Sequence, residues 1–179
     1  RVGRVGGGVL AWAAFPRGDC FRGIAAVVAG DGDGLLLPGG VDGQFLGAVG
    51  QAVGPHLVRQ KKGKVINISS IYAKIAGACF SPYCVTKAAL SMFTRCLALE
   101  WAPFNICVNA IGPGYVSTEM IAEGLAVPEI KESILDPTPL KRLGEPREVA
   151  LLAVYLASEA ANFLTGQTMY LDGGRLAGG

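Results

Sequence analysis

Lys64-Val-Ile-Asn-Ile-Ser-Ser70 is the stretch that decides the fold, because it is an apolar, β-branched run bounded by Gly63 and by serines. A short continuous run of this kind is typical of a parallel strand that is buried on both faces. A segment with apolar residues at helical spacing opens at Ser81-Pro82, and proline is tolerated in the first turn of a helix. Residues 106–111 form a second buried run, which Gly112-Pro113-Gly114 ends. The order predicts a strand, a helix and a second strand.

The same alternation continues toward the carboxyl terminus. A helix is predicted from Pro146 and a last strand over Thr168–Leu171, and residues 51–59 are typical of a helix end before the first strand. Strands that alternate with helices predict an α/β fold, here a Rossmann-like three-layer parallel sheet. Ligands of such sheets bind beyond the carboxyl ends of the strands, where Ser70 and residues 112–118 are expected.

The first fifty residues differ from the rest of the chain. They are crowded with glycine, as at Gly6-Gly7-Gly8 and Gly30-Asp-Gly-Asp-Gly34, and no apolar period persists in them. We expect residues 1–50 to be rich in loops or poorly ordered, since glycine raises the entropy lost on folding, although residues 35–37 could form a short strand. The chain is therefore divided into this atypical segment and a second part over residues 51–179, which contains the predicted strands and helices named above.

Composition restricts the class of protein. Of the 179 residues, 51% are hydrophobic and 17% are charged, so apolar surface should be covered by helices or by other subunits, and a homodimer or homotetramer is expected. A formal net charge of +2, with one basic cluster over residues 61–64, gives no electrostatic footprint for nucleic acid. The sequence contains no run of about 18 apolar residues, so no membrane span is predicted. Residues 1–14 lack the charged, apolar and cleavable regions of a signal peptide.

The number and spacing of the cysteines indicate a reducing compartment and do not predict a metal site. The five cysteines form no Cys-x-x-Cys pair, and His56 is the single histidine that could complete a zinc site. The cysteines are Cys20, Cys79, Cys84, Cys96 and Cys107. We expect reduced thiols in a cytoplasmic protein.

Three residues suggest a reaction centre. Tyr83 and Lys87 are four apart on the predicted helix, so their side chains share one face. A tyrosine with a pKa near 10 is a poor base at neutral pH, and we expect the Lys87 ammonium to lower this pKa. Ser70 ends the preceding strand, where its hydroxyl could donate to a substrate oxygen on which charge develops. The spacing of Tyr83 and Lys87 also arises by chance, but its conjunction with the strand ends predicts interconversion of an alcohol and a ketone.

Four motifs, in order and at fitting spacings, resemble the short-chain dehydrogenase/reductase family of the classical type over about residues 51–174. They are Asn67-Ile-Ser-Ser70, Tyr83-Cys-Val-Thr-Lys87, Asn109-Ala-Ile-Gly-Pro-Gly-Tyr-Val-Ser-Thr118 and Leu171-Asp-Gly-Gly174.

The resemblance implies a role for each matching residue. Tyr83 would be the acid and base, Ser70 would orient and polarise the carbonyl, and Lys87 would lower the tyrosine pKa and bond the nicotinamide ribose of NAD or NADP. The residues implied to hold the cofactor are Tyr83, Lys87, Pro113, Gly114, Val116 and Thr118. An ordinary turn at Pro113-Gly114 and a helix cap at Thr118 are the alternative interpretations.

The resemblance narrows the substrate less sharply. Residues 97–103 and 139–146 are similar to family members that act on sugar acids, such as gluconate dehydrogenases, and to 3-oxoacyl-carrier-protein reductases. A small-molecule alcohol or ketone is therefore the expected partner, and residues 119–145 are expected to form a lid over it.

The family pattern fails near the amino terminus. Its glycine-rich turn after the first strand is not recognisable, since Gly3-x-x-Gly6-x-Gly8 has only two residues before it. The sequence therefore predicts an amino-terminally incomplete fold, and the choice between NAD and NADP, which depends on residues after the second strand, stays open. The second hypothesis is a truncated, inactive member of the family that acts through oligomerisation with full-length relatives.

Overall fold

The computed structural model describes residues 2–5, 8–11, 24–29, 37–39 and 54–178. Residues 54–60 are helical. The other elements are β1 (Val2–Val5), β2 (Gly8–Ala11), β3 (Ile24–Ala29), β4 (Leu37–Gly39), β5 (Gly63–Ile68), η1 (Ile71–Ala73), α2 (Ser81–Trp101), η2 (Ala102–Phe104), β6 (Ile106–Pro113), α3 (Glu119–Leu125), α4 (Pro128–Leu135), α5 (Pro146–Ala157), η3 (Glu159–Ala161) and β7 (Thr168–Leu171).

The central sheet has the strand order β4-β3-β5-β6-β7. β5 and β6 are parallel, with Gly63 opposite Ile106, and β6 and β7 are parallel, with Ala110 opposite Thr168. This confirms the predicted Rossmann-like α/β arrangement. The sheet is not parallel throughout, however, because β3 runs antiparallel to both β5 and β4.

The first fifty residues contain more strands than the sequence suggested. Residues 24–29 form β3 because Ile24-Ala-Ala-Val-Val-Ala29 is a continuous apolar run, which its glycine-rich surroundings obscure. Leu37 begins β4, whereas residues 35 and 36, which were part of the same strand prediction, lie outside the described residues, as do residues 51–53 of the predicted helix end.

Gly3 and Gly8 lie in a pair of short strands. β1 pairs antiparallel with β2, and Gly3 lies opposite Leu10. A phosphate-binding turn needs a strand that leads into a helix amino terminus, whereas β1 pairs with the strand that begins at Gly8.

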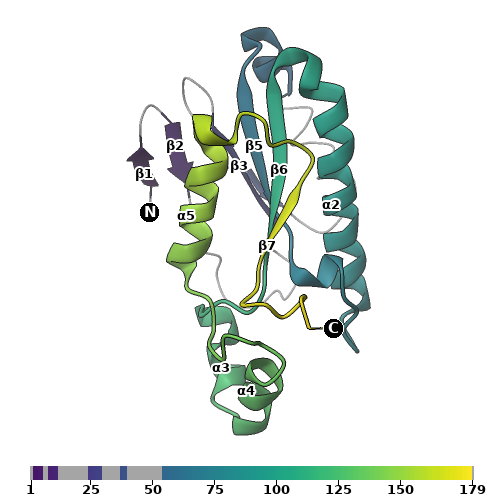
Figure 1. The fold of residues 1–179 in the computed structure, drawn as a ribbon, viewed down its shortest axis with the longest axis vertical. Helices are drawn as coiled ribbons and strands as arrows, with labels where there is room; N and C mark the ends of the chain where they lie inside the picture. The colour runs from purple at the N-terminus through teal and green to yellow at the C-terminus, as the bar shows by residue number, and fades with distance from the viewer. Residues whose placement is uncertain (1, 6–7, 12–23, 30–36, 40–53, 179) are drawn as a thin grey trace.

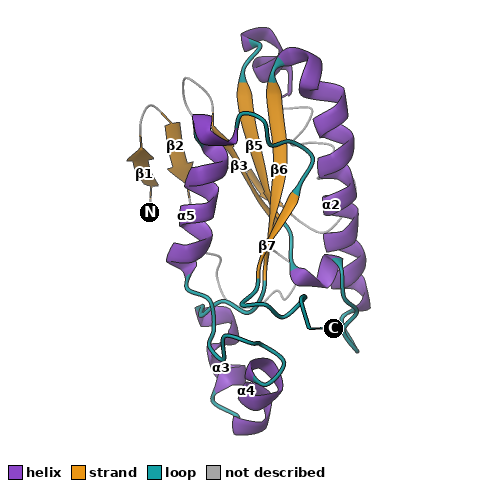
Figure 2. Ribbon diagram, in the orientation of Figure 1, coloured by secondary structure: helices purple, strands orange, loops and turns teal. Residues whose placement is uncertain are grey.

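Helices cover both faces of the sheet (Figure 1). On one face, α2 and the helix at residues 54–60 pack on β5 and β6, and on the other face α5 packs on the same strands (Figure 2). The first core cluster contains Leu57, Val65, Leu97, Ala98, Ile106 and Val108, and the second contains Ile66, Ile111, Val149, Ala153, Leu156 and Ala161. Alternate residues of each strand enter different clusters, because successive side chains of a strand point to opposite faces.

Buried polar contacts fix how α2 lies on β5. The Asn67 amide donates to Thr94 Oγ1 at 2.9 Å, and both side chains are buried. Ser69 Oγ donates to the carbonyl of Lys87 at 3.1 Å and lies 2.8 Å from Ser91 Oγ. Buried polar groups of this kind are costly to leave unpaired, so these bonds set the position of the start of α2 beside the end of β5.

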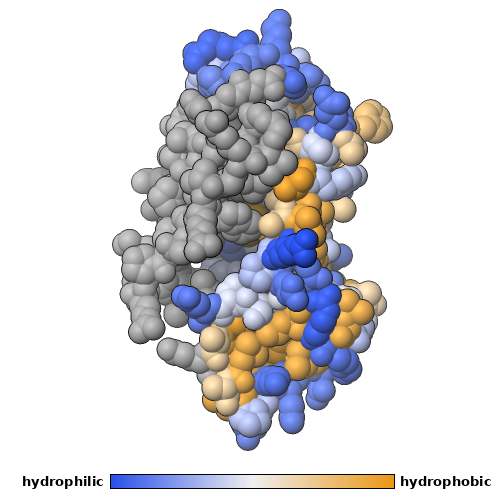
Figure 3. Space-filling model, turned by 90° about the vertical axis from the view of Figure 1, so that its left-hand side faces the viewer, coloured by the Kyte–Doolittle hydropathy of each residue, from blue (hydrophilic) through white to orange (hydrophobic). Residues whose placement is uncertain are grey.

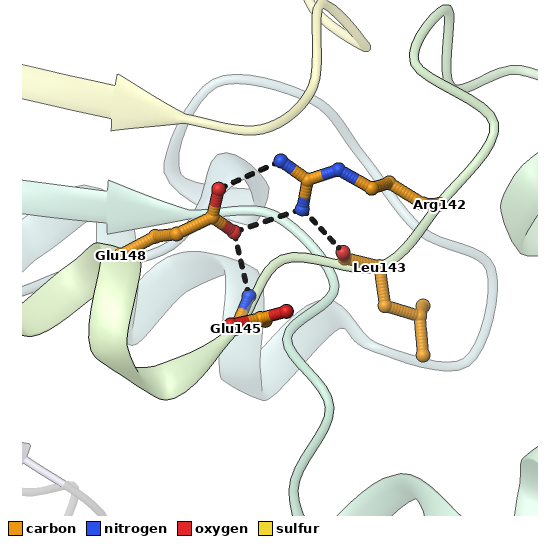
Figure 4. A network of polar contacts seen from close by, with 4 residues as sticks. All are labelled: Arg142, Leu143, Glu145 and Glu148. Carbon is orange, nitrogen blue, oxygen red and sulfur yellow. Dashed lines mark hydrogen bonds and ion pairs between the residues drawn. The ribbon is translucent and has the colours of Figure 1, made fainter.

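Two short helices project from the sheet beyond the carboxyl end of β6. α3 and α4 form a separate lobe at the bottom of Figure 1. The chain returns from this lobe through Arg142, whose guanidinium makes two bonds to the Glu148 carboxylate at 2.9 and 2.7 Å (Figure 4). Glu148 also accepts from the Glu145 backbone N–H at 2.8 Å, so this network caps the start of α5.

Candidate active site

Ser70 directly follows β5 and caps the short helix η1. Its backbone is extended, its side chain is buried, and Oγ accepts a hydrogen bond from the Tyr72 backbone N–H at 3.2 Å. Because β5 and β6 are parallel, the carboxyl ends of both strands meet at this edge, and the Ser69 N–H donates to the Ile111 carbonyl at 2.7 Å. Ser70 therefore stands where ligands of parallel sheets bind.

Tyr83 and Lys87 lie on the first two turns of α2, whose first turn contains Pro82. Lys87 is only 4% exposed, and its Nζ donates to the Ile68 carbonyl at 2.9 Å, at the end of β5. The same Nζ lies 5.5 Å from the centre of the Tyr83 ring. The structure thus brings Tyr83, Lys87 and Ser70 to one place, while their catalytic roles stay a prediction.

Burial shifts the pKa of both titratable members of this group. Burial raises the pKa of Tyr83 above its ordinary value, and a hydrogen bond with Ser70 opposes this by a smaller amount. This direction is opposite to the one expected from the sequence. The Lys87 ammonium lies over the Tyr83 ring and donates to a backbone carbonyl. Desolvation of the phenol, which disfavours the charged phenolate, is therefore the largest effect on its pKa. Burial also lowers the pKa of Lys87 to about 8.

The predicted cofactor segment continues from β6. Pro113 ends the strand, and the Gly114 N–H donates to the Leu171 carbonyl at 2.9 Å. A Cβ on Gly114 would lie 2.9 Å from the Asp172 Cα, so this close approach requires glycine. Val116 forms a bridge with Gly144, and Thr118 is exposed immediately before α3. The segment therefore runs along the same edge of the sheet as Ser70.

Two tyrosines at this edge were missed by the sequence reasoning. The hydroxyls of Tyr72 and Tyr115 lie 2.7 Å apart, and the Tyr72 ring packs edge-on against Tyr83 with centroids 6.0 Å apart. Their positions in the sequence could have indicated that they belong to the site, because Tyr72 follows Ser70 by two residues and Tyr115 directly follows Gly114.

The turn after β7 is closed by its own backbone. The Asp172 carboxylate accepts from the Gly174 N–H at 3.0 Å and from the Leu176 N–H at 2.8 Å. Within the described part of the chain, no group of three or more His, Cys, Asp or Glu side chains could hold a metal ion.

This geometry places the protein among α/β proteins that hold a ligand at the carboxyl ends of a parallel sheet. A family model described as enoyl-(acyl carrier protein) reductase matches residues 43–175. The chain belongs to the short-chain dehydrogenase/reductase family, which confirms the resemblance that its motifs carried.

Several curated relatives of the chain are named as oxidoreductases of sugar alcohols or sugar acids. Galactitol 2-dehydrogenase (L-tagatose-forming) of Cereibacter sphaeroides is 41% identical over 136 residues, which cover 75% of this chain and 53% of that protein. The 5-keto-D-gluconate 5-reductase of Escherichia coli (strain K12) is 40% identical over 128 residues, which cover 72% and 50% respectively. The chain thus spans about half the length of the curated relatives it matches.

Solved structures agree with this family. A gluconate 5-dehydrogenase from Burkholderia cenocepacia J2315, in complex with NADP and tartrate, superposes with a TM-score of 0.72 at 34% identity, covering 74% of this chain and 52% of that one. A 3-oxoacyl-[acyl-carrier protein] reductase from Brucella melitensis ATCC 23457 has a TM-score of 0.68 at 37% identity, covering 73% and 48%.

Proposed function

We propose that this chain carries the catalytic part, residues 51–179, of an NAD(P)-dependent oxidoreductase that interconverts a secondary alcohol and a ketone. The observation that carries the proposal is the placement of Tyr83 beside Ser70, with the Lys87 ammonium over its ring. A phenol held next to a hydroxyl donor at the carboxyl ends of two parallel strands suits proton transfer to a carbonyl oxygen.

Each of the three side chains has a distinct task in this proposal. Tyr83 Oη donates its proton to the substrate oxygen during reduction and takes it back during oxidation. Ser70 Oγ donates a hydrogen bond to the same oxygen, which stabilises the negative charge that develops there. Lys87 holds a positive charge beneath the site, because with a pKa of about 8 it is mostly protonated at neutral pH.

The residues present fit the nicotinamide end of NAD or NADP. Lys87 supplies an ammonium for the ribose hydroxyls, Thr118 supplies an exposed hydroxyl, and Pro113, Gly114 and Val116 supply the backbone that would lie along the nicotinamide. When bound, the cofactor would supply or accept the hydride. The relatives with bound NADP support this assignment, and the choice between NAD and NADP stays open.

Relatives suggest two substrate classes, which are sugar acids and 3-oxoacyl groups. The lobe of α3 and α4 is proposed to act as the lid over this substrate. Figure 3 shows apolar surface over this lobe, and Val127 and Ile130 are among its exposed side chains. Such a surface suits contact with the less polar parts of a substrate and of the cofactor.

Binding of NADH and NADPH to the purified chain, measured by fluorescence and calorimetry, tests this function. We expect saturable binding of one or both cofactors, weakened by Lys87→Met because the ribose loses its ammonium partner. Lys61→Met, at an exposed lysine before the amino end of β5, is the matched control and should bind as the wild type does. A folded chain that binds neither cofactor at millimolar concentration would contradict the proposal.

The raised pKa of Tyr83 predicts different pH profiles for the two directions of the reaction. Between about pH 6 and 8, oxidation of the alcohol should accelerate up to about tenfold per pH unit, because only the phenolate accepts a proton. Reduction of the ketone should change little over that range, because the phenol predominates throughout. Initial rates in both directions check this, and a flat oxidation profile would exclude Tyr83 as a base with a raised pKa.

The alternative function is an inactive member of the family that acts through oligomerisation with full-length relatives. The outer face of α2 favours it, because Val85, Met92 and Leu99 are 69%, 53% and 80% exposed at helical spacing. The same face would serve a homodimer or homotetramer of an active enzyme. Association without cofactor binding would favour the alternative.

Cellular placement and the remaining partners stay predictions. Among the described residues, no helix has the length and apolar character needed to cross a membrane. A cytoplasmic location and the absence of a nucleic-acid partner rest on the sequence alone.

A further inference from the structure

The edge of the sheet that carries Ser70 also carries an aromatic wall, formed by Tyr72, Phe80, Tyr83 and Tyr115. The Tyr72 ring lies at its centre. It stacks on Phe80 with centroids 5.4 Å apart and planes 6° apart, and it meets Tyr83 and Tyr115 edge-on at 6.0 and 6.4 Å. The wall therefore includes the proposed proton donor and two further tyrosines, residues 72 and 115, which the proposed reaction does not use.

The wall is not purely apolar, because it contains a hydroxyl pair, Tyr72 and Tyr115. Their oxygens lie 2.7 Å apart, so one hydroxyl donates to the other. Two phenols carry two protons, and this bond uses one of them. The accepting hydroxyl therefore has a proton to give to a further oxygen. Burial and the Tyr115 hydrogen bond raise the pKa of Tyr72 well above its ordinary value, so Tyr72 stays protonated at neutral pH.

A positive charge lies behind the pair. The Arg175 guanidinium is 5.2 Å from the centre of the Tyr115 ring and donates to the Ile134 carbonyl at 2.9 Å, which ties the carboxyl-terminal turn to α4. Its charge is close enough to oppose the rise in the Tyr72 pKa. The neighbouring Asp172 carboxylate is engaged by two backbone N–H groups of its own turn. Arg175 thus adds positive potential beside Tyr115.

We propose that the Tyr72 and Tyr115 hydroxyl pair, with Arg175 behind it, binds a hydroxyl group and the carboxylate of a polyhydroxylated acid whose reacting carbon lies at Tyr83. This inference rests on the proposed function and selects the sugar-acid class over the 3-oxoacyl class. A plain acyl chain offers no hydrogen-bonding group to the pair, so binding such a chain would leave the free hydroxyl proton of the pair without the water it loses. Sites built to hydrogen-bond a substrate hydroxyl reject analogues that lack it for this reason.

Calorimetric titration of the full chain with two acids of equal length and charge tests the inference. The probes are D-gluconate, which carries a hydroxyl on each carbon beyond the carboxylate, and hexanoate, which carries none. We expect the wild type to bind gluconate more tightly. Tyr72→Phe and Tyr115→Phe should each weaken gluconate binding by about tenfold, the scale of one lost hydrogen bond, and leave hexanoate binding unchanged.

Two further variants separate a lost contact from a disturbed structure. Phe80→Leu removes the stacking partner of Tyr72 but no hydroxyl, so a merely structural role of the wall would weaken both acids in this variant and in Tyr72→Phe. Arg175→Gln should weaken both acids, because both have the carboxylate. Equal gluconate and hexanoate affinities in the wild type, or a ratio unchanged by Tyr72→Phe and Tyr115→Phe, would overturn the inference.

The result can be told apart from a failure of the proposed function, because calorimetry needs no hydride transfer. A gluconate preference that depends on the hydroxyl pair, in a chain without NADPH-linked turnover, would support the subsite and contradict the oxidoreductase activity. Turnover with an unchanged affinity ratio would contradict the subsite and support the activity.

Discussion

Tyr83→Phe is expected to lower the rate of NADPH-linked reduction of 5-keto-D-gluconate by about 10²–10⁴-fold, the usual contribution of a positioned general acid. The substitution removes one oxygen and its proton. The ring remains, so its edge-on contact with Tyr72 and its place beneath the Lys87 ammonium are kept. The measurement is the single-turnover rate at saturating cofactor, which reports proton and hydride transfer separately from product release.

Tyr155→Phe is the matched control for this prediction. Tyr155 lies on α5, is 41% exposed, and belongs to the opposite face of the sheet, so its hydroxyl should be dispensable. Thermal unfolding of both variants should match the wild type, since neither phenylalanine creates a cavity. A Tyr83→Phe variant that retains more than about a tenth of the wild-type rate would remove Tyr83 from the role of acid.

The strands and the helix that carry the site were predictable, because the signals for each element lie within its own stretch of sequence. The run at residues 64–69 was found to within a residue of β5, because a strand buried on both faces is continuously apolar. The strand Thr168–Leu171 was found with the bounds of β7, although β7 is only half-buried. Pro82 marked the start of α2 in the same way. Ser70, Tyr83 and Lys87 came together because each follows or faces one of these elements.

The Tyr72 and Tyr115 pair could not be predicted in this way. These residues are 43 positions apart, and their contact depends on the adjacency of β5 and β6 and on side-chain directions beyond the strand ends. The strand direction of β3 also depends on tertiary pairing, since an apolar run such as residues 24–29 fits a parallel or an antiparallel neighbour equally well.

The direction of the Tyr83 pKa was predicted wrongly for a related reason. The sequence shows that an ammonium is four residues away, which favours the phenolate, but it does not show how much water the phenol loses. In the structure the second effect is larger than the first. Charge spacing along a helix therefore gives the sign of one contribution to a pKa, whereas burial, which depends on the packed neighbours, can reverse the total.

In the wild type, the free energy of unfolding should change with pH between about pH 8 and 10.5, because Lys87 titrates there. Lys87→Met should remove this pH dependence. Burial lowers the pKa of Lys87 from 10.5 to about 8 in the folded chain. Between these two values the unfolded chain binds more protons than the folded chain, so stability rises with pH in the wild type. The full rise is on the order of 3 kcal/mol, from the difference between the two pKa values, and below pH 8 the wild type carries this whole cost of burying an ammonium.

Methionine fills the same space without a charge, and the variant loses the contacts of the ammonium with the Tyr83 ring and with the Ile68 carbonyl, of which the hydrogen bond is worth about 1 kcal/mol. At pH 7 we therefore expect Lys87→Met to be more stable than the wild type by about 2 kcal/mol, and by pH 10 most of this advantage should vanish. Urea unfolding at both pH values measures it, and comparing the two proteins cancels the titration of Tyr83, which both retain. A stability difference that does not change with pH would mean that the pKa of Lys87 is not lowered. A variant that is more stable but binds the cofactor weakly would show that the buried ammonium lowers the free energy of unfolding of the wild type. Such a loss of stability is expected of a residue that is retained for its chemistry.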